Sequence, residues 1–409
     1  MLRFLTAGES HGRRLTLILD GVPAGLALDI EAITRDLRRR QGGYGRGKRM
    51  ELESDTPVIS AGVRHGLTTG APLAITIDNR DWVNWEFTMH PDADVPPQAG
   101  GARRAPVTRP RPGHADLAGA FKYGHDDLRD VLERASARET AARVAAGAVA
   151  RQILVQIGVR VASHVVSIGD VATDLATPVG FDAIAALPDD SPTHCADPSV
   201  ETRMIAAIDA ARTAGDTLGG AFEVVATGVP PGLGSYAQWD LRLDGRLAQA
   251  LMSIPGIKAV GIGIGPDAAR LPGSRVHDEI RLSDPDRAGP PPRLFTRPTN
   301  HAGGLEGGVT NGEDVRVTAY MKPIATLMAP LRSVDLATMQ EASAAVERSD
   351  VCAVPAAAVV GEAMVALTLC AAVIDRFGGD SIAELRRRHA DWCQQSAARF
   401  ARDPGAPSS

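Results

Sequence analysis

The chain has 409 residues, of which 44% are hydrophobic and 23% are charged. These fractions are typical of globular proteins, so they exclude a disordered chain, a collagen-like chain and a coiled-coil rod. The formal net charge of −5 provides no general basic field for holding nucleic acid.

Hydrophobic periodicity predicts helices and strands that alternate along the chain. The expected strands are 15–19, 73–77, 159–168, 222–227 and 315–320. The expected helices are 30–40 after the cap Asp29, 139–157 stopped at Gly158, 200–214 ended by Gly215, a helix from the cap Asp240 to Ser253, and a last helix opened by a capping box at 381–384. This alternation favours one large mixed α/β domain over residues 1–400, followed by a frayed tail over 401–409.

One apolar segment, residues 352–374, is long enough to cross a bilayer. Because it contains Pro355, Gly361 and the costly acid Glu362, a helix buried in a large core is the expected structure. The four cysteines have no zinc-ligand spacing, and the first residues do not form a signal-peptide pattern. We therefore expect a cytoplasmic protein with free thiols, no metal site and no membrane contact.

Arginine is in large excess, since only four of the 44 basic residues are lysines. A genome rich in Arg codons would produce this excess, but arginine also binds carboxylates and phosphates in a bidentate way. Several arginines lie in Gly- and Pro-rich loops, where functional groups are commonly displayed. Arg46 and Arg49 lie on a loop whose flexible glycines suggest close approach to an anion, whereas Arg38 and Arg39 can be explained by the negative end of their helix.

Two histidines lie in the same kind of loop. His11 is flanked by glycines and Ser10, and His114 follows Arg111 in a loop stiffened by prolines. An imidazole can exchange protons near neutral pH, although a structural hydrogen bond is the alternative for each ring. Arg138 is four residues from Arg134, so both are expected on one helical face, either at the site or paired with nearby acids.

Together these loops predict a site for a small molecule that carries phosphate and carboxylate groups, with imidazole proton donors nearby. The patterns themselves do not name a reaction. A P-loop and a hydrolase elbow are absent, and the glycines at 261–265 do not complete a dinucleotide fingerprint.

At these residues the chain resembles the chorismate synthases. The shared motifs, in family order, are Gly-Glu-Ser-His-Gly at 8–12, Gly-Tyr-Gly-Arg-Gly at 43–47, Arg-Pro-Gly-His-Ala-Asp at 111–116, Ser-Ala-Arg-Glu-Thr at 136–140, Gly-Val-Pro-Pro-Gly-Leu-Gly at 228–234, Val-His-Asp-Glu at 276–279, Ala-Gly-Gly-Leu-Glu-Gly-Gly at 302–308, Lys-Pro-Ile-Ala-Thr at 322–326 and Arg-Ser-Asp at 348–350. The resemblance implies helices sandwiched between antiparallel β-sheets and a homotetramer.

The resemblance also implies the last common step of the shikimate pathway. In this step 5-enolpyruvylshikimate 3-phosphate loses phosphate by 1,4-anti elimination to give chorismate, and reduced FMN (FMNH2) is required. NADPH would be a further cofactor only if the chain reduces its own flavin.

Roles for individual residues follow from the resemblance. His11, helped by Ser10, would protonate the departing phosphate, and Asp350 would face the flavin N5 and assist removal of the substrate proton. His114 would protonate the flavin, with Ser136 as a relay. The substrate would be bound by Arg40, Arg46, Arg49, Arg111, Arg138 and Arg348. The flavin would be lined by Ala135, Ser136, Ala137, Pro255, Gly256, Gly307, Lys322, Pro323, Ile324, Ala325, Thr326 and Arg348.

The chain departs from the family pattern at 254–261, where Ile-Pro-Gly-Ile-Lys-Ala-Val-Gly stands in place of Ile-Gln-Ala-Ile-Lys-Gly-Val-Glu. Pro255 removes a backbone donor, so we expect altered flavin affinity there. Two alternatives stay open. One is a flavin-binding paralogue with weakened or lost lyase activity. The other is an RNA- or polyanion-binding module, against which the net charge and the 4% of aromatic residues argue.

Overall fold

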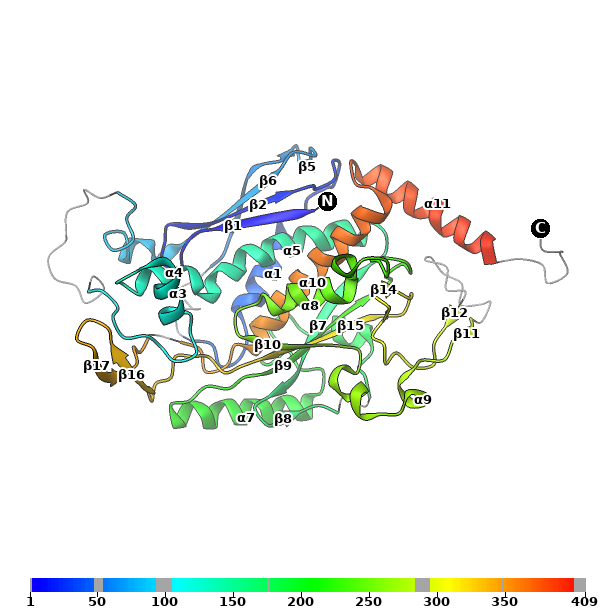
Figure 1. The fold of residues 1–409 in the computed structure, drawn as a ribbon. Coiled ribbons are helices and arrows are strands. Elements are labelled where there is room, and N and C mark those ends of the chain that lie inside the picture. Colours follow the sequence, from blue (N-terminus) through cyan, green and yellow to red (C-terminus); the bar gives the residue numbers. More distant parts are fainter. Residues whose placement is uncertain are drawn as a thin grey trace.

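Two antiparallel β-sheets form outer layers of the fold, with a layer of helices between them (Figure 1). This arrangement confirms the predicted sandwich of helices between antiparallel sheets. The computed structural model describes residues 2–47, 54–92, 105–174, 177–283, 295–347 and 349–400.

The first sheet has the strand order β1-β2-β6-β3. Its strands are β1 (Arg3–Ala7), β2 (Arg14–Asp20), β6 (Leu73–Asp78) and β3 (Pro57–Ala61). Successive side chains of β2 alternate between the two faces, as strand geometry requires, so Leu15, Leu17 and Leu19 are buried against the helices. Ile18 instead faces outward beside Leu5 of β1, its register partner.

The second sheet has the order β10-β15-β9-β7-β8. Its strands are β10 (Ile257–Ile262), β15 (Val315–Met321), β9 (Gly220–Thr227), β7 (Arg160–Ile168) and β8 (Val171–Ala172). β9 and β7 are buried along most of their length, because the central helices cover one face and α6 (Phe181–Ala185) and α7 (Pro198–Ala214) pack on the other. Burial on both faces explains why each strand carries apolar residues at consecutive positions, such as Val165 and Val166 of β7 and Val224 and Val225 of β9.

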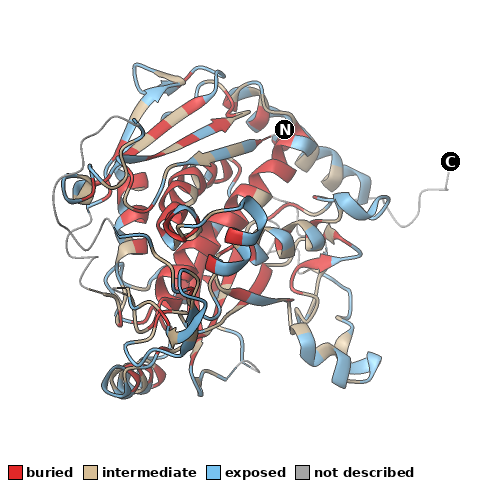
Figure 2. Cartoon of the chain, turned by 60° about the vertical axis from the view of Figure 1, so that its left-hand side comes forward, coloured by how far each residue is buried: buried red, intermediate tan, exposed pale blue. Residues whose placement is uncertain are grey.

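The central layer consists of α1 (Ile30–Gln41), α5 (Thr140–Val155) and α10 (Val354–Phe377). Small residues let α5 and α10 approach closely, and a Cβ added to Gly147 would lie 2.3 Å from the Cα of Ala363. α8 (Leu243–Met252) packs against α10, and α11 (Ile382–Phe400) follows it. The buried residues in Figure 2 concentrate in this layer and on the sheet faces that meet it.

The remaining helices and 3-10 turns are η1 (Arg80–Asn84), α3 (Asp116–Tyr123), α4 (Arg129–Ala135), η3 (Ala137–Glu139), α6 (Phe181–Ala185), α7 (Pro198–Ala214), η4 (Trp239–Leu241), η5 (Gly265–Arg270) and α9 (Gly273–Val276). Short antiparallel ribbons pair β4 (Val63–Arg64) with β5 (Leu67–Thr68), β11 (Arg281–Leu282) with β12 (Phe295–Thr296), β13 (Leu305–Glu306) with β14 (Val309–Thr310), and β16 (Arg332–Asp335) with β17 (Gln340–Ser343).

Most predicted elements are confirmed within a few residues of their expected bounds. Asp29 caps α1 by accepting a hydrogen bond from the backbone N–H of Ala32, and Ser381 caps α11 through the N–H of Glu384. The prediction that Asp240 caps a helix was wrong. Asp240 lies inside η4, and α8 begins after Arg242 without a side-chain cap. The predicted tail over 401–409 lies outside the described residues.

The apolar segment 352–374 forms most of α10. Among the described residues, α10 is the one helix long and apolar enough to cross a membrane, with a mean hydropathy of 2.2 in its most apolar window. However, 94% of that window is buried inside the fold. The prediction of a buried core helix is therefore confirmed.

Candidate active site

The loop between β1 and β2 carries His11 and is held by residues far away in the sequence. The Nδ1 atom of His11 lies 2.8 Å from Glu133 Oε1, and the backbone N–H of His11 donates to Glu133 Oε2 at 2.7 Å. The Trp85 ring stacks on the imidazole, with ring centroids 3.8 Å apart. Asn79 Nδ2 donates to the carbonyls of Ser10 and Gly12, which fixes the path of the loop.

Ser10 joins this loop to the turn that follows α4. Its hydroxyl accepts a hydrogen bond from the hydroxyl of Ser136 at 3.1 Å, and its backbone N–H donates to the carbonyl of Glu133. Ala135 and Ala137 flank Ser136 where α4 gives way to η3. The structure therefore brings together the predicted residues Ser10, His11 and Ser136.

Two of the predicted arginines share one buried carboxylate beside that turn. Arg138 Nη1 lies 2.7 Å from Asp55 Oδ1, and Arg40 Nη1 lies 3.6 Å from Asp55 Oδ2. Arg40 also donates to Thr140 Oγ1 and to the carbonyl of Ala137. All three charged side chains are nearly fully buried, which strengthens the attraction between them.

Arg134 does not share a helical face with Arg138, so that prediction was wrong. α4 ends at Ala135, and Ser136 has an extended backbone, which breaks the helix between the two arginines. Arg134 donates to the carbonyls of Thr6 and Gly8 at 2.9 Å and so ties α4 to the end of β1.

Arg46 faces Asp350, which follows the β16–β17 ribbon. Its Nη1 pairs with Asp350 Oδ2, and the N–H of Gly47 donates to Asp350 Oδ1 at 2.7 Å. Gly45 has a φ of +91° and packs on Cys352, so the glycines here are required by backbone conformation and close packing rather than by flexibility. The predicted residues Arg49 and Arg348 lie outside the described residues.

Arg111 and His114 converge on Asp116, the first residue of α3. Arg111 binds both oxygens of Asp116 at 2.9 and 3.0 Å, and His114 Nδ1 contacts Asp116 Oδ1. Burial alone would raise the pKa of Asp116, but the hydrogen bonds from His114 and Arg111 hold that pKa well below its usual range. Arg111 Nη1 also donates to Thr326 Oγ1 at 3.2 Å.

The segment from Lys322 to Thr326, which also contains Pro323, Ile324 and Ala325, leaves the end of β15 beside the Arg111 loop. A Cβ placed on Gly113 would lie 3.6 Å from Lys322 Nζ and 3.8 Å from Ala325 Cβ. The backbone N–H of Lys322 donates to the carbonyl of Gly256 at 2.9 Å. Burial and the nearby charge of Lys258 both lower the pKa of Lys322.

The turn that departs from the family pattern lies at this end of the same sheet. The N–H of Ile257 donates to the carbonyl of Ile254 at 3.1 Å, and Gly256 has a φ of +87°. Proline second and a left-handed glycine third are the preferred residues of a type II turn. Pro255 and Gly256 therefore stabilise the turn that leads into β10.

The Lys322 segment and the Asp350 segment are held to one another through the turn before β9. Thr217 Oγ1 donates to the carbonyl of Ile324, and the N–H of Leu218 donates to the carbonyl of Val351, both at 2.8 Å. Gly307 lies elsewhere in the chain, in the turn of the β13–β14 ribbon, where a Cβ added to it would meet no atom within 4 Å. β15 has seven residues, so the two ends of this sheet are about 20 Å apart at 3.3 Å per residue.

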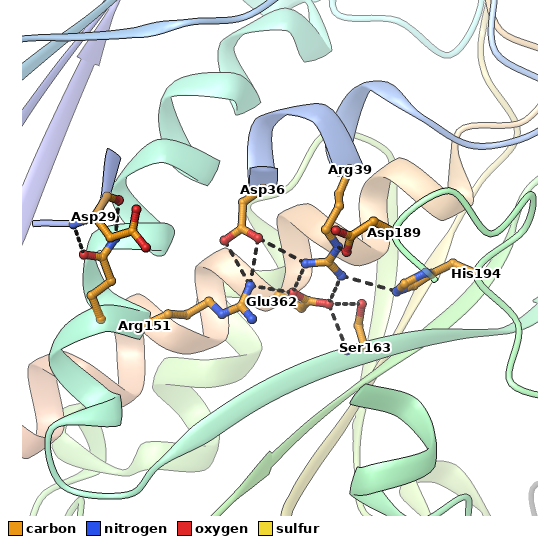
Figure 3. Close-up of polar contacts among 9 residues, drawn as sticks. Asp29, Asp36, Arg39, Arg151, Ser163, Asp189, His194 and Glu362 are labelled. Atoms are coloured by element: carbon orange, nitrogen blue, oxygen red, sulfur yellow. Dashed lines mark hydrogen bonds and ion pairs between the residues drawn. The ribbon is translucent and has the colours of Figure 1, made fainter. Parts of the chain in front are cut away.

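A cavity of about 300 Å³ lies away from these residues, at a buried cluster of ion pairs (Figure 3). Glu362 of α10 accepts from Arg39 at 2.7 and 2.8 Å, from Arg151 at 3.1 Å, and from the hydroxyl of Ser163 at 2.8 Å. Arg151 also binds Asp36. In this cluster two arginines face two carboxylates, so each charge has a partner of opposite sign. The cluster links α1, α5, α10 and β7 and is therefore a structural element.

Sequence reasoning missed three carboxylates that hold the predicted side chains: Asp55, Asp116 and Glu133. Asp116 is the last residue of the motif at 111–116, and its short spacing to His114 was the available signal. Glu133 and Asp55 are distant in sequence from His11 and Arg138, so only the fold reveals their contacts.

Comparison with known proteins agrees with this geometry. The family model for chorismate synthase matches residues 2–374. A chorismate synthase of Symbiobacterium thermophilum is 54% identical, covering 97% of this chain and all of its own length, and one of Moorella thermoacetica is 57% identical, covering 96% and 99%. A crystal structure of a chorismate synthase, 40% identical, superposes with a TM-score of 0.76 and covers 97% of this chain and 98% of its own.

These matches place the chain among the carbon–oxygen lyases of the shikimate pathway. The chain belongs to the chorismate synthase family, and its function is that of the family.

Proposed function

We propose that the chain converts 5-enolpyruvylshikimate 3-phosphate to chorismate by 1,4-anti elimination of phosphate, with reduced FMN bound beside the substrate. The main support is the pairing of Arg40 and Arg138 on a single buried carboxylate next to His11 and Ser10. Two guanidinium groups, which bind phosphate and carboxylate in a bidentate way, are thereby held close to an imidazole. A substrate with one phosphate and two carboxylates carries the anionic groups that such donors bind.

The residues around Lys322 fit a flavin phosphate and ring. Burial and the charge of Lys258 lower the pKa of Lys322, and a bound phosphate dianion would offset both effects. Gly113 and Ala325 are small residues beside Lys322, which suits the close approach of a flat ring. Ala135, Ser136, Ala137 and the segment Lys322–Thr326 would hold the cofactor. When bound, reduced FMN supplies electron density transiently to the substrate.

The chain's own residues would bind the substrate and move its protons. Arg111 and Arg46 would orient its anionic groups, while His11 would donate a proton to the departing phosphate oxygen, aided by the Ser136–Ser10 hydrogen bond. Asp350, held by Arg46 and the N–H of Gly47, would assist removal of the substrate proton. His114, oriented by Asp116, would hold a proton toward the flavin.

The decisive experiment is an anaerobic assay with 5-enolpyruvylshikimate 3-phosphate and photoreduced FMN, in which phosphate and chorismate are both measured. We expect equimolar release of the two products. His11→Ala should lower turnover by about 10²–10⁴, the usual contribution of general acid catalysis. Binding of FMN without turnover would refute the proposal and favour the flavin-binding paralogue.

We further propose that residues 1–400 act as one catalytic domain, since the main hydrophobic cluster includes residues from Leu2 to Leu385. The proposed assembly is a homotetramer. It is supported by an apolar strip on the outer face of the first sheet, where Leu5 is 74% exposed beside Ile18.

A cytoplasmic location fits the four free cysteines. Native mass spectrometry tests the assembly, and flavin reduction by NADPH alone tests whether the chain needs a separate reductase.

A further inference from the structure

We propose that Glu133 is a positioning residue that keeps a proton on Nδ1 of His11, so that Nε2 is the nitrogen that exchanges a proton with the substrate. This inference rests on the proposed role of His11 as the general acid. The inference adds Glu133 to the residues that act in the reaction.

The geometry of Glu133 is specific for one edge of the His11 ring. One carboxylate oxygen contacts the ring Nδ1 at 2.8 Å, and the other accepts the backbone N–H of the same residue at 2.7 Å. A carboxylate accepts hydrogen bonds and, when ionised, donates none. Nδ1, which faces the carboxylate, therefore carries a proton in the doubly protonated ring and keeps it after the ring loses the proton on Nε2.

Burial makes this interaction strong and fixed. The Glu133 side chain is 1% exposed and the His11 side chain 13% exposed, so water competes weakly for either group. Arg129 lies one helical turn before Glu133 on α4, with its Nη1 3.7 Å from Glu133 Oε1. A cation at this distance attracts the carboxylate and so helps to hold it in place.

A second contact fixes the plane of the imidazole. The Trp85 ring stacks on it at an interplanar angle of 25°, and the indole N–H donates to Asp81 Oδ2 at 2.9 Å. The carboxylate thus sets the rotation of His11 within the ring plane, and the indole sets the plane itself. Together they aim Nε2 in one direction, as the orienting acid of a catalytic triad does for its histidine.

Glu133→Gln separates this role from simple anchoring of the loop. The glutamine carbonyl can still accept the backbone N–H of His11, while its amide group would then face Nδ1 and donate to it. The variant keeps the shape of the site but transfers the ring proton of neutral His11 to Nε2. We expect kcat to fall at least 100-fold with KM changed less than about threefold, because a wrong tautomer in a serine protease costs about 10⁴ in kcat.

The tautomer of neutral His11 is a measurement that a purely structural role of Glu133 would leave unchanged. Protein labelled with ¹⁵N-histidine is measured by solid-state NMR, and the His11 signals are assigned by their loss in His11→Ala. The wild-type protein should show neutral His11 protonated on Nδ1, and Glu133→Gln should show it protonated on Nε2. Because the first measurement needs no change at Glu133, it remains decisive if the variant does not fold.

Two further variants complete the experiment. Glu133→Asp keeps a carboxylate, so it should retain the Nδ1 proton and recover part of the lost kcat. Asp130→Asn removes a carboxylate on the same helix whose side chain is 61% exposed, and it should match the wild-type kcat and tautomer. Wild-type His11 protonated on Nε2, or Glu133→Gln with kcat within threefold of wild type, would overturn the inference alone. An unchanged rate in His11→Ala would overturn the proposed acid and this inference with it.

Discussion

The buried carboxylate of Glu362 allows a quantitative prediction about stability. Burial alone would raise its pKa from the ordinary 4.5, but the charges and hydrogen bonds of Arg39 and Arg151 lower it to about 2. Each tenfold change in the protonation equilibrium corresponds to about 1.4 kcal/mol, so ionised Glu362 contributes about 3 kcal/mol to the free energy of unfolding. The cost of breaking a buried ion pair, about 3–5 kcal/mol, is of the same size.

The sign of the pH dependence follows from the lowered pKa. A carboxyl whose pKa is depressed by folding stabilises the protein fully above its unfolded value of 4.5 and loses that contribution as the pH falls toward 2. Glu362→Gln keeps the side-chain volume but removes the charge. The variant should therefore be about 3 kcal/mol less stable than wild type at pH 7, and the difference should shrink by more than half at pH 3.

Urea unfolding at a fixed protein concentration measures both differences, because association changes apparent stability. The matched control is Glu341→Gln. Glu341 pairs with Arg332 through side chains that are 78% and 90% exposed, so its loss should cost less than about 1 kcal/mol. A Glu362→Gln variant within 1 kcal/mol of wild type at pH 7, or equally destabilised at pH 7 and pH 3, would refute the assignment of this stability to the ion pairs.

Two further predictions concern the site. Arg46→Lys should raise KM or lower kcat about tenfold or more, because lysine lacks the planar fork that binds carboxylate and phosphate. Steady-state assays measure this change. The control is Arg387→Lys, an exposed site in α11, which should show no effect. Pro255→Gln restores a backbone donor and should tighten FMN binding about twofold to tenfold, the contribution of one hydrogen bond, in a fluorescence titration. Equal affinity would remove Pro255 from the flavin site.

The predictable part of the fold is local. Alternating leucines identify β2, and side-chain caps identify the starts of α1 and α11, because each signal involves residues within a few positions of one another. β1 escaped prediction because its five residues, Arg-Phe-Leu-Thr-Ala, do not alternate clearly between polar and apolar. Asp240 failed as a cap because a 3-10 turn intervenes before α8.

The predictable part of the site is the set of groups that act on small molecules, since these lie in recognisable loops. The carboxylates that orient those groups are harder to foresee. Glu133 reaches His11 across 122 positions of sequence, and Asp55 reaches Arg138 across 83. Such contacts depend on how the sheets and helices stack, and no short-range pattern records that arrangement.

The position of α10 in the chain has a consequence for synthesis on the ribosome. This helix is apolar enough to resemble a membrane span, and it follows α1, α5, β7, β9 and α8, all of which pack against it. Because the chain emerges from its N-terminus, these partners leave the ribosome before α10 does. This apolar helix is therefore made when most of its binding surfaces already exist.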